Sequence, residues 1–271
     1  HPLSELLTCF WIFVTISTQG ARVLMLVFEL SDRKKQILEA VIADYIDTAV
    51  PVGSFTISKH YIKQSSPATV RNELADLERL GFITHPHTSA GRIPTDLGYR
   101  YYVDHIMETK TVSGKEISLV KTGIRKIGHG LEDVFKGVAR VLSSMLNYVT
   151  VFVRFGKQKQ VYSAGMSNML KQPEFKNIEQ ARQMLETLEH EDMLSEVMEE
   201  YLKQKALDIR IGHENKLDNL QELSVIVAQY NFRDNERGAF GIIGPTRMNY
   251  SRVSSVLSYI SDEIDNMLEE F

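Results

Sequence analysis

Residues 65–94 restrict the fold of this chain more than any other stretch of the sequence. Ser66 is a residue type that caps helix N-termini, and Pro67 suits the first helical position because its missing N–H needs no partner there. Apolar residues then recur at intervals of three and four until Gly81, a residue type that commonly follows the end of a helix. The pattern predicts a helix over residues 67–80 with one buried face and one polar face.

The segments on either side complete a defined order of elements. A core helix with apolar residues at helical spacing is expected from Ser31, and a short second helix is expected at Ser54, which we predict to be its N-cap. After the third helix, short apolar strands around Ile83 and Ile93 flank a turn that contains Pro and Gly. Helix, turn, helix and hairpin in this order predict a winged helix-turn-helix domain over residues 25–105.

The polar face of the predicted third helix carries side chains that suit DNA recognition. Arg71 and Asn72 are the residue types that form bidentate hydrogen bonds with guanine and adenine in the major groove. Small neighbours allow the helix to approach closely, and nearby hydroxyl and cationic side chains suit phosphate oxygens. We predict that bases are read by Thr69, Arg71 and Asn72, with Ala68 on the same face allowing close approach. Phosphates or the minor groove are expected to be held by Lys59, Lys63, Ser65, Ser66, His87, Thr88 and Arg92.

The distribution of charge supports this interpretation although the total charge does not. The formal net charge is −4, so no overall basic character indicates a nucleic-acid partner. Acidic residues are nevertheless absent from the sequence between Asp47 and Glu73 and again between Glu78 and Asp96, whereas Lys, Arg and His occur in both segments. The two segments expected to face a DNA duplex therefore lack carboxylates.

Other chemistries are weaker interpretations of the same sequence. His85 and His87 are spaced as a metal-binding pair, but two histidines without a third ligand nearby are more often polar loop residues. Cys9 is the only cysteine, which excludes an internal disulfide and a cysteine-cluster zinc site and agrees with a reducing compartment. The sequence contains no glycine-rich phosphate loop, nucleophile elbow or metalloprotease helix. We expect no enzyme, no cofactor and no metal site.

The remainder of the chain predicts an α+β fold. Residues 106–147 have helical spacing and are expected to connect the first domain to a second. Residues 148–271 alternate between β-branched or aromatic runs and amphipathic stretches, which is typical of a sheet covered by helices. Strands are predicted at residues 148–155, 161–164, 209–211, 223–230 and 239–243, and helices within residues 178–205 and over residues 250–268.

An uncharged, apolar run at residues 6–17 has the character of a signal-peptide core or a membrane anchor. It is shorter than the roughly 20 residues that a spanning helix needs, and no Lys or Arg precedes it. We expect Met25 to be the biological start and residues 1–24 to be upstream sequence, with a membrane-tethered protein as the alternative. On the first interpretation the protein is cytoplasmic and has no stable association with a membrane.

Several separate blocks of the sequence follow one another in order between about residue 30 and residue 271. They comprise residues 51–54, 66–78, 86–96, 98–100 and 102–104, and in the second half residues 165–170, 172–175 and 243–250. Together these blocks resemble one family, the heat-inducible transcription repressor HrcA of bacteria, and their number and order make the resemblance more specific than a single helix-turn-helix.

The resemblance implies a winged-helix domain followed by a GAF-like domain. It also implies a homodimer that binds double-stranded DNA at an inverted-repeat operator upstream of chaperone operons, and a GroE-type chaperonin that keeps the repressor active until heat diverts it. Members of this family carry a long inserted segment where only residues 154–160 stand here, so we expect the GAF-like domain of residues 148–271 to be shortened. The alternative function is a regulator whose GAF-like domain senses a small molecule, which requires a polar-lined pocket.

Overall fold

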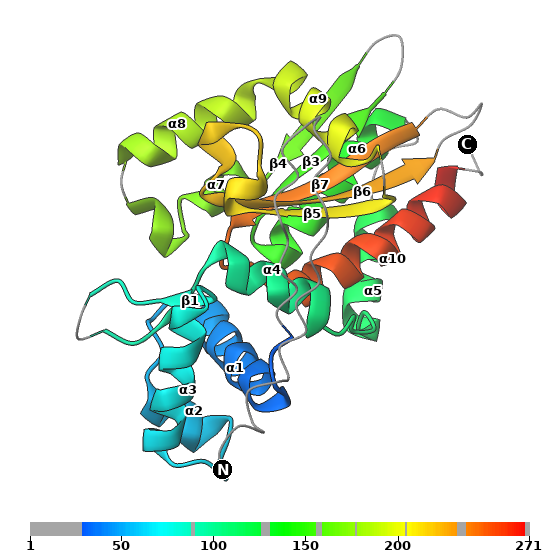
Figure 1. Ribbon diagram of the computed structural model, residues 1–271. Coiled ribbons are helices and arrows are strands. Elements are labelled where there is room, and N and C mark those ends of the chain that lie inside the picture. The colour runs from blue at the N-terminus through cyan, green and yellow to red at the C-terminus, as the bar shows by residue number, and fades with distance from the viewer. Residues whose placement is uncertain are drawn as a thin grey trace, which may run out of the picture.

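A computed structural model describes residues 29–87, 90–125, 131–155, 159–176, 178–203, 205–231 and 237–268 of the chain. The expectations for residues 1–24 and for Thr88 lie outside the described residues. The described chain combines helices with antiparallel strands, which confirms the predicted α+β class (Figure 1).

The described N-terminal part contains three helices and a hairpin in the predicted order, followed by a fourth helix. Ser66 caps the third helix with Pro67 in the first helical turn, as predicted, and Ser31, where the first helix was expected to begin, is the cap of that helix. The predicted cap of the second helix is wrong, because Ser54 is itself the first helical residue and Gly53 precedes it without a side-chain cap. The elements are α1 (Asp32–Thr48), α2 (Ser54–His60), α3 (Pro67–Arg79), β1 (Ile83–Thr84), β2 (Ile93–Pro94) and α4 (Asp96–His105).

The facing sides of α1 and α3 form the core of this part. Leu38 and Val41 on α1 are buried in the same cluster as Leu74 and Leu77 on α3. Gly81 follows α3 with a φ of 82°, a left-handed conformation that favours glycine, and it turns the chain into β1. The antiparallel pair β1 and β2 then returns the chain to α1, which β2 contacts.

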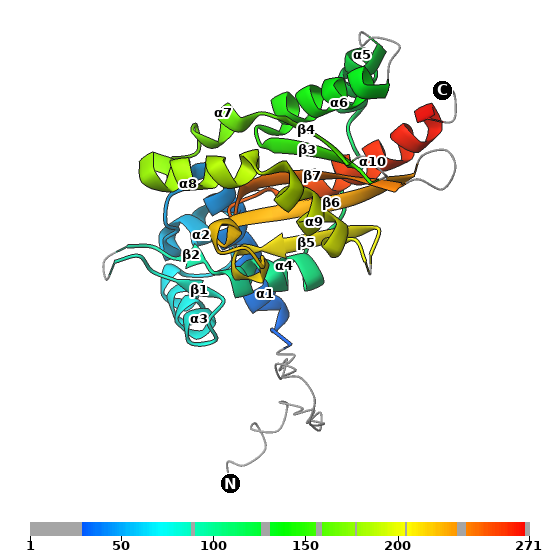
Figure 2. The ribbon, with the colours of Figure 1, turned by 90° about the horizontal axis from the view of Figure 1, so that it is seen from above.

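The C-terminal part is an antiparallel sheet covered by helices on both faces (Figure 2). Within the described residues its five strands lie in the order β4-β3-β7-β6-β5. No described helix has the length and apolar character needed to cross a membrane. The elements are α5 (Gly114–Arg125), α6 (Leu131–Leu146), β3 (Val149–Arg154), β4 (Gln160–Ala164), α7 (Met166–Met169), η1 (Pro173–Lys176), α8 (Ile178–Glu189), α9 (Glu191–Tyr201), β5 (Leu207–Ile211), η2 (Gly212–Glu214), η3 (Asp218–Leu220), β6 (Leu223–Asn231), β7 (Arg237–Pro245) and α10 (Tyr250–Leu268).

Alternate residues of the strands face opposite layers of helices. Phe152 and Phe240 belong to the cluster that includes α6 and α10, whereas Val151 and Val227 belong to the cluster with Met198 of α9. The two-residue period of a strand therefore supplies two cores, one on each face of the sheet. Helix α6, which we expected in a connector, contacts β3 and β4 and is part of one of these layers.

A short connection joins β3 to β4, where the resemblance implies a long inserted segment. The two strands pair antiparallel from Thr150 opposite Ala164 to Arg154 opposite Gln160. The other edge of β3 pairs along its whole length with β7. The chain therefore builds a continuous sheet across β3 and β4 without a long segment between them.

Helix α4 joins the two parts of the molecule. Tyr99 is buried, and its ring lies against Tyr250 of α10 with the ring centroids 5.5 Å apart. Arg100 donates from Nε to Glu214 Oε1 at 2.7 Å and from Nη2 to the carbonyl oxygen of Ile209 at 2.5 Å. Burial alone would lower the pKa of Arg100, but the hydrogen bonds to Glu214 and the negative charge of Glu214 outweigh this effect and raise the pKa above its ordinary value. The guanidinium therefore stays charged.

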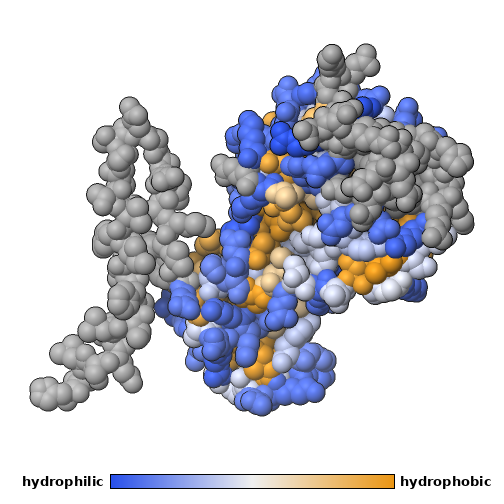
Figure 3. All heavy atoms as spheres, turned by 90° about the vertical axis from the view of Figure 1, so that its right-hand side faces the viewer, coloured by the Kyte–Doolittle hydropathy of each residue, from blue (hydrophilic) through white to orange (hydrophobic). Residues whose placement is uncertain are grey.

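Further polar contacts hold the same two parts together. Asp96 accepts a hydrogen bond from the backbone N–H of His213 at 3.0 Å. Arg247 donates from Nη1 to the carbonyl oxygen of Ile46 at 2.6 Å and from Nε to Glu174 at 2.6 Å. On the face shown in Figure 3, hydrophobic residues gather along the middle of the molecule, with hydrophilic residues around them. The N-terminal part is thus packed against the sheet rather than tethered by a linker.

We expect the substitution Gly98→Ala to disturb the packing of α4 within the N-terminal part. An added Cβ at Gly98 would lie 2.0 Å from the carbonyl oxygen of Phe82, a backbone atom that cannot move independently. Overpacking costs about 1–3 kcal/mol and the helix propensity of Ala returns about 1 kcal/mol, so the free energy of unfolding should fall by up to about 2 kcal/mol. Gly114→Ala is the matched control, because a Cβ there meets nothing within 4 Å. Equal thermal unfolding of the two variants would contradict the expectation.

Candidate nucleic-acid interface

The start of α3 is fixed by its own side chains. Ser66 Oγ accepts a hydrogen bond from the backbone N–H of Thr69 at 3.1 Å, and the two hydroxyl oxygens lie 2.9 Å apart. A cap of this kind satisfies one of the backbone N–H groups that a helix N-terminus leaves without a partner. The other N–H groups of the first turn remain available for an anion such as a phosphate.

The outer face of α3 presents the residues predicted to read bases. Ala68, Arg71 and Asn72 are exposed, while Val70 and Leu74 are buried on the opposite face. Neither the Arg71 guanidinium nor the Asn72 amide has a side-chain partner among the described residues. Both groups can therefore form new hydrogen bonds without breaking existing ones.

Cations from α1 neutralise the carboxylates of α3. Lys34 Nζ lies 2.9 Å from Glu73 and 3.2 Å from Asp76, and the hydrogen bond to Glu73 raises the pKa of Lys34. Arg33 adds a weaker contact with Glu73 at 3.7 Å. These ion pairs lower the repulsion that the carboxylates would exert on a phosphate backbone. The sequence shows which segments lack acidic residues. It does not show that Glu73 and Asp76, which follow the first of these segments, are paired with Lys34.

Arg33 is a candidate site residue that the sequence interpretation missed. Its Nη2 donates to Ser65 Oγ at 2.9 Å, immediately before the cap of α3, and its side chain is 44% exposed. The contact places a cation beside the helix N-terminus where phosphate binding is predicted. No local pattern indicates it, because the two residues are 32 positions apart in the chain.

The hairpin is tied to α3 by an ion-pair cluster around Glu78. Arg92 donates from Nε to Glu78 at 2.9 Å, and His85 Nδ1 contacts the other carboxylate oxygen of Glu78. Arg92 also donates from Nη1 to the Ala90 carbonyl oxygen at 3.4 Å. The Arg92 guanidinium, which was predicted to hold phosphate, thus fixes the hairpin to α3. His87, the other described hairpin residue that was predicted to contact DNA, is exposed.

The remaining predicted contacts lie on or just after α2. Lys59 stands over the ring of Phe55, with Nζ 5.8 Å from the ring centroid, and Lys63 is exposed. Both precede the cap of α3 in the chain. No group of three His, Cys, Asp or Glu side chains within the described residues could hold a metal ion. Lys63, Ser66 and Arg71 thus lie in one region of the N-terminal part. Among the described residues there is no metal-binding cluster beside them.

The hairpin contact should weaken in acid. Partial burial raises the pKa of Glu78, but the hydrogen bond with His85 and the charge of Arg92 lower it below its ordinary 4.5. A carboxylate with a lowered pKa in the folded state adds stability above its unfolded pKa, and that stability is lost as the pH falls through the folded pKa. We expect Glu78→Gln to unfold more easily than the wild type at neutral pH. The difference should shrink below about pH 4, and a difference independent of pH would contradict this prediction.

Comparison with known proteins identifies the family. The family model for the HrcA protein C-terminal domain matches residues 109–254. The heat-inducible transcription repressors HrcA of Desulforamulus reducens and Halalkalibacterium halodurans are 31% and 30% identical, over 89% of this chain and 98% of each relative. The chain belongs to the HrcA family of heat-inducible transcription repressors.

Two further findings concern the fold and the length. A crystal structure of a hypothetical protein has a TM-score of 0.68 with 19% identity, covering 88% of this chain and 98% of that one, and thus shares the fold. The alignments to the two named repressors run over 339 positions, more than the 271 residues of the whole chain. These relatives therefore contain residues that have no counterpart here.

Proposed function

We propose that this repressor binds DNA directly through α3 and the β1–β2 hairpin, which act as a winged helix. The observation that carries the proposal is the outer face of α3, where Arg71 and Asn72 are exposed and unpaired among the described residues while Glu73, Asp76 and Glu78 are neutralised. Arg71 reads guanine and Asn72 reads adenine in the major groove. The N-terminus of α3, Lys63 and Arg33 hold phosphates.

The operator in this proposal is an inverted repeat upstream of chaperone genes, bound by a homodimer. Two-fold symmetry of the protein is then mirrored in the DNA, with one α3 in each half-site. The C-terminal sheet is the GAF-like half, and the segment that the relatives have and this chain lacks falls between β3 and β4. Dimer contacts are made by the remainder of that half. The compartment is the cytoplasm, where this DNA partner lies.

A GroE-type chaperonin keeps the repressor competent in this proposal, and heat releases repression by diverting the chaperonin. Membership of a heat-inducible repressor family supports this role. Dependence on a chaperonin fits a protein of marginal stability, since a small loss of free energy greatly increases the unfolded fraction. Addition of a GroE-type chaperonin should raise the fraction of freshly refolded protein that binds the operator.

The experiment that tests the proposal combines mass in solution with DNA titration. Light scattering should give the mass of two chains, and an inverted-repeat duplex should bind more tightly than a duplex with one half-site scrambled. A monomer that binds both duplexes equally would contradict the dimeric mode. Absence of binding to any duplex would contradict the DNA-binding role itself.

A further inference from the structure

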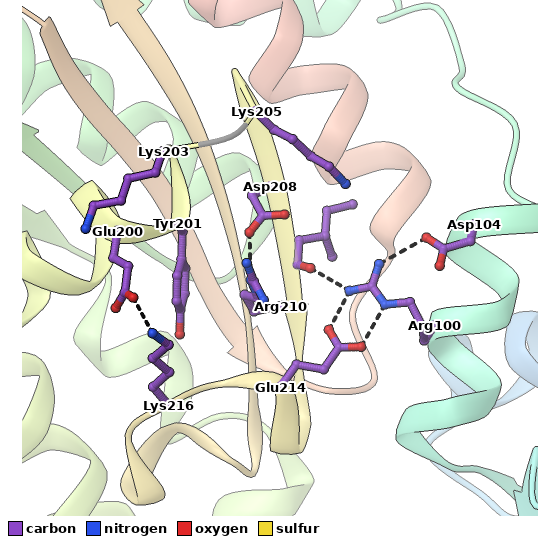
Figure 4. Close-up of a pocket in the computed structure, with 11 residues that line it drawn as sticks. Arg100, Asp104, Glu200, Tyr201, Lys203, Lys205, Asp208, Arg210, Glu214 and Lys216 are labelled. Carbon is purple, nitrogen blue, oxygen red and sulfur yellow. Dashed lines mark hydrogen bonds and ion pairs between the residues drawn. The ribbon is translucent and has the colours of Figure 1, made fainter. Parts of the chain in front are cut away.

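A charged cleft of about 550 Å³ lies on the side of the molecule where α4 meets the end of the sheet. Its walls come from α4, the end of α9, strand β5 and the segment after it (Figure 4). It is distinct from the outer face of α3, since no residue of α3 lines it. The lining residues are Arg100, Asp104, Glu200, Tyr201, Lys203, Lys205, Asp208, Ile209, Arg210, Glu214 and Lys216.

The cleft has more positive than negative charge, in a chain whose formal net charge is −4. Each of its four carboxylates is paired with a cation of the lining: Asp104 and Glu214 with Arg100, Glu200 with Lys216, and Asp208 with Arg210. Lys203 and Lys205 have no carboxylate within ion-pair distance among the described residues. Two ammonium groups thus remain without a paired counter-charge, which favours an anion in the cleft.

Arg210 provides a pre-oriented anion ligand on one wall. Its guanidinium carbon lies 5.0 Å from the centroid of the Tyr201 ring, and its Nε donates to Asp208 at 2.6 Å. Its two terminal amino groups have no partner among the described residues. A stacked guanidinium with a free edge matches the oxygens of a phosphate group in a bidentate manner.

The support beneath Arg210 is buried. Tyr201 is 3% exposed, and its hydroxyl donates to Asn215 Oδ1 at 3.1 Å. The Asn215 amide in turn reaches the carbonyl oxygens of Gly212 at 2.9 Å and Leu223 at 2.8 Å. Because this network is held by backbone atoms, the position of Arg210 is set before any ligand arrives.

The other cations surround the same space. In Figure 4, Lys205 extends toward the side of the cleft where Arg100 lies, whereas Lys203 stands at the opposite rim. The Lys216 ion pair is exposed, with its side chain 63% accessible, so an anion can displace Glu200 at little cost. The lining thus offers a ligand with two phosphate groups a guanidinium on one wall and ammonium groups at the rim.

We propose that this cleft binds a small molecule carrying two linked phosphate groups, with Arg210 and Lys205 as its ligands. The inference is independent of the proposed DNA-binding function, since it involves no residue of α3 or the hairpin. Arg100 lines the cleft and also holds α4 to Glu214 and Ile209. A ligand seated there favours the packed arrangement of the two parts, because binding stabilises the conformation that it selects.

Calorimetric titration of the full chain with inorganic pyrophosphate, at constant ionic strength, tests the proposal. The wild type should show saturable one-to-one binding, and Arg210→Ala and Lys205→Ala should weaken it about tenfold or more. Arg210→Lys keeps the charge but loses the forked geometry, so it should weaken binding as well. Lys115→Ala, an exposed lysine on α5 outside the cleft, is the charge-matched control and should bind as the wild type does. Circular dichroism confirms that each variant is folded.

Titration with ADP distinguishes the sources of the phosphate groups. Equal affinity for ADP and pyrophosphate would support recognition of the phosphates alone, and tighter binding of ADP would support a nucleotide. No binding of pyrophosphate to the wild type, or binding to folded Arg210→Ala and folded Arg210→Lys that is as tight as binding to the wild type, would overturn the proposal. Loss of duplex DNA binding in Lys205→Ala with pyrophosphate binding intact would also overturn it, because the cleft would then belong to the DNA surface.

Discussion

Replacing Arg71 with Ala should weaken binding to the inverted-repeat operator about 10- to 100-fold, because a bidentate contact to a base is worth about 1–3 kcal/mol. The loss should be smaller on an unrelated duplex, where Arg71 has no matching guanine, so the preference for the operator should fall as well. Arg71 is exposed and has no partner among the described residues, so its removal should leave the fold intact. Gel-shift titrations on both duplexes measure the two effects.

Lys63→Ala is the comparison that separates base reading from phosphate contact. Lys63 is exposed shortly before the cap of α3 and is predicted to hold a phosphate. Its loss should weaken binding to both duplexes alike and should lower the slope of log affinity against log salt by about one. If the two variants lose affinity and preference in the same way, α3 does not read bases through Arg71.

The elements of the N-terminal part could be predicted because their signals are local. Ser31, Ser66 and Gly81 mark the ends of helices through bonds to backbone groups a few residues away, and all three stand where the sequence predicts them. Ser54 failed as a cap because Gly53 already occupies the position before the first turn. A serine is common at N-caps, but its presence does not determine whether it or the neighbouring glycine occupies the N-cap position.

The junction between the two parts could not be predicted in the same way. Arg100 and Glu214 are 114 positions apart, and no sequence pattern around either residue indicates that the other is its partner. Residues 98–100 form one block of the family resemblance, and the apolar spacing predicts Tyr99 on a packed helix that leaves the first domain, but neither indicates which residues of the second half they contact. In the structure the three residues of this block meet Phe82, Tyr250 and Glu214, which explains the block by packing rather than by DNA contact. The amphipathic pattern of α6 likewise indicates that one face of the helix is buried, but it does not indicate that this face packs on the sheet.

Arg100→Ala should therefore reduce the free energy of unfolding by about 2–4 kcal/mol, because it leaves the half-buried Glu214 carboxylate and the Ile209 carbonyl oxygen without their charged donor. Arg182→Ala is the matched control, since Arg182 also pairs with two carboxylates but on an exposed helix surface, where water screens the ion pairs and their loss should cost much less. Urea unfolding monitored separately by operator binding and by circular dichroism should give one transition for Arg182→Ala. For Arg100→Ala the two signals should separate, because the N-terminal part loses its anchor on the sheet before the sheet itself unfolds. Coincident transitions with a wild-type midpoint in Arg100→Ala would show that the other contacts of the junction, such as Tyr99 with Tyr250 and Arg247 with Ile46, hold the two parts together without the ion pair.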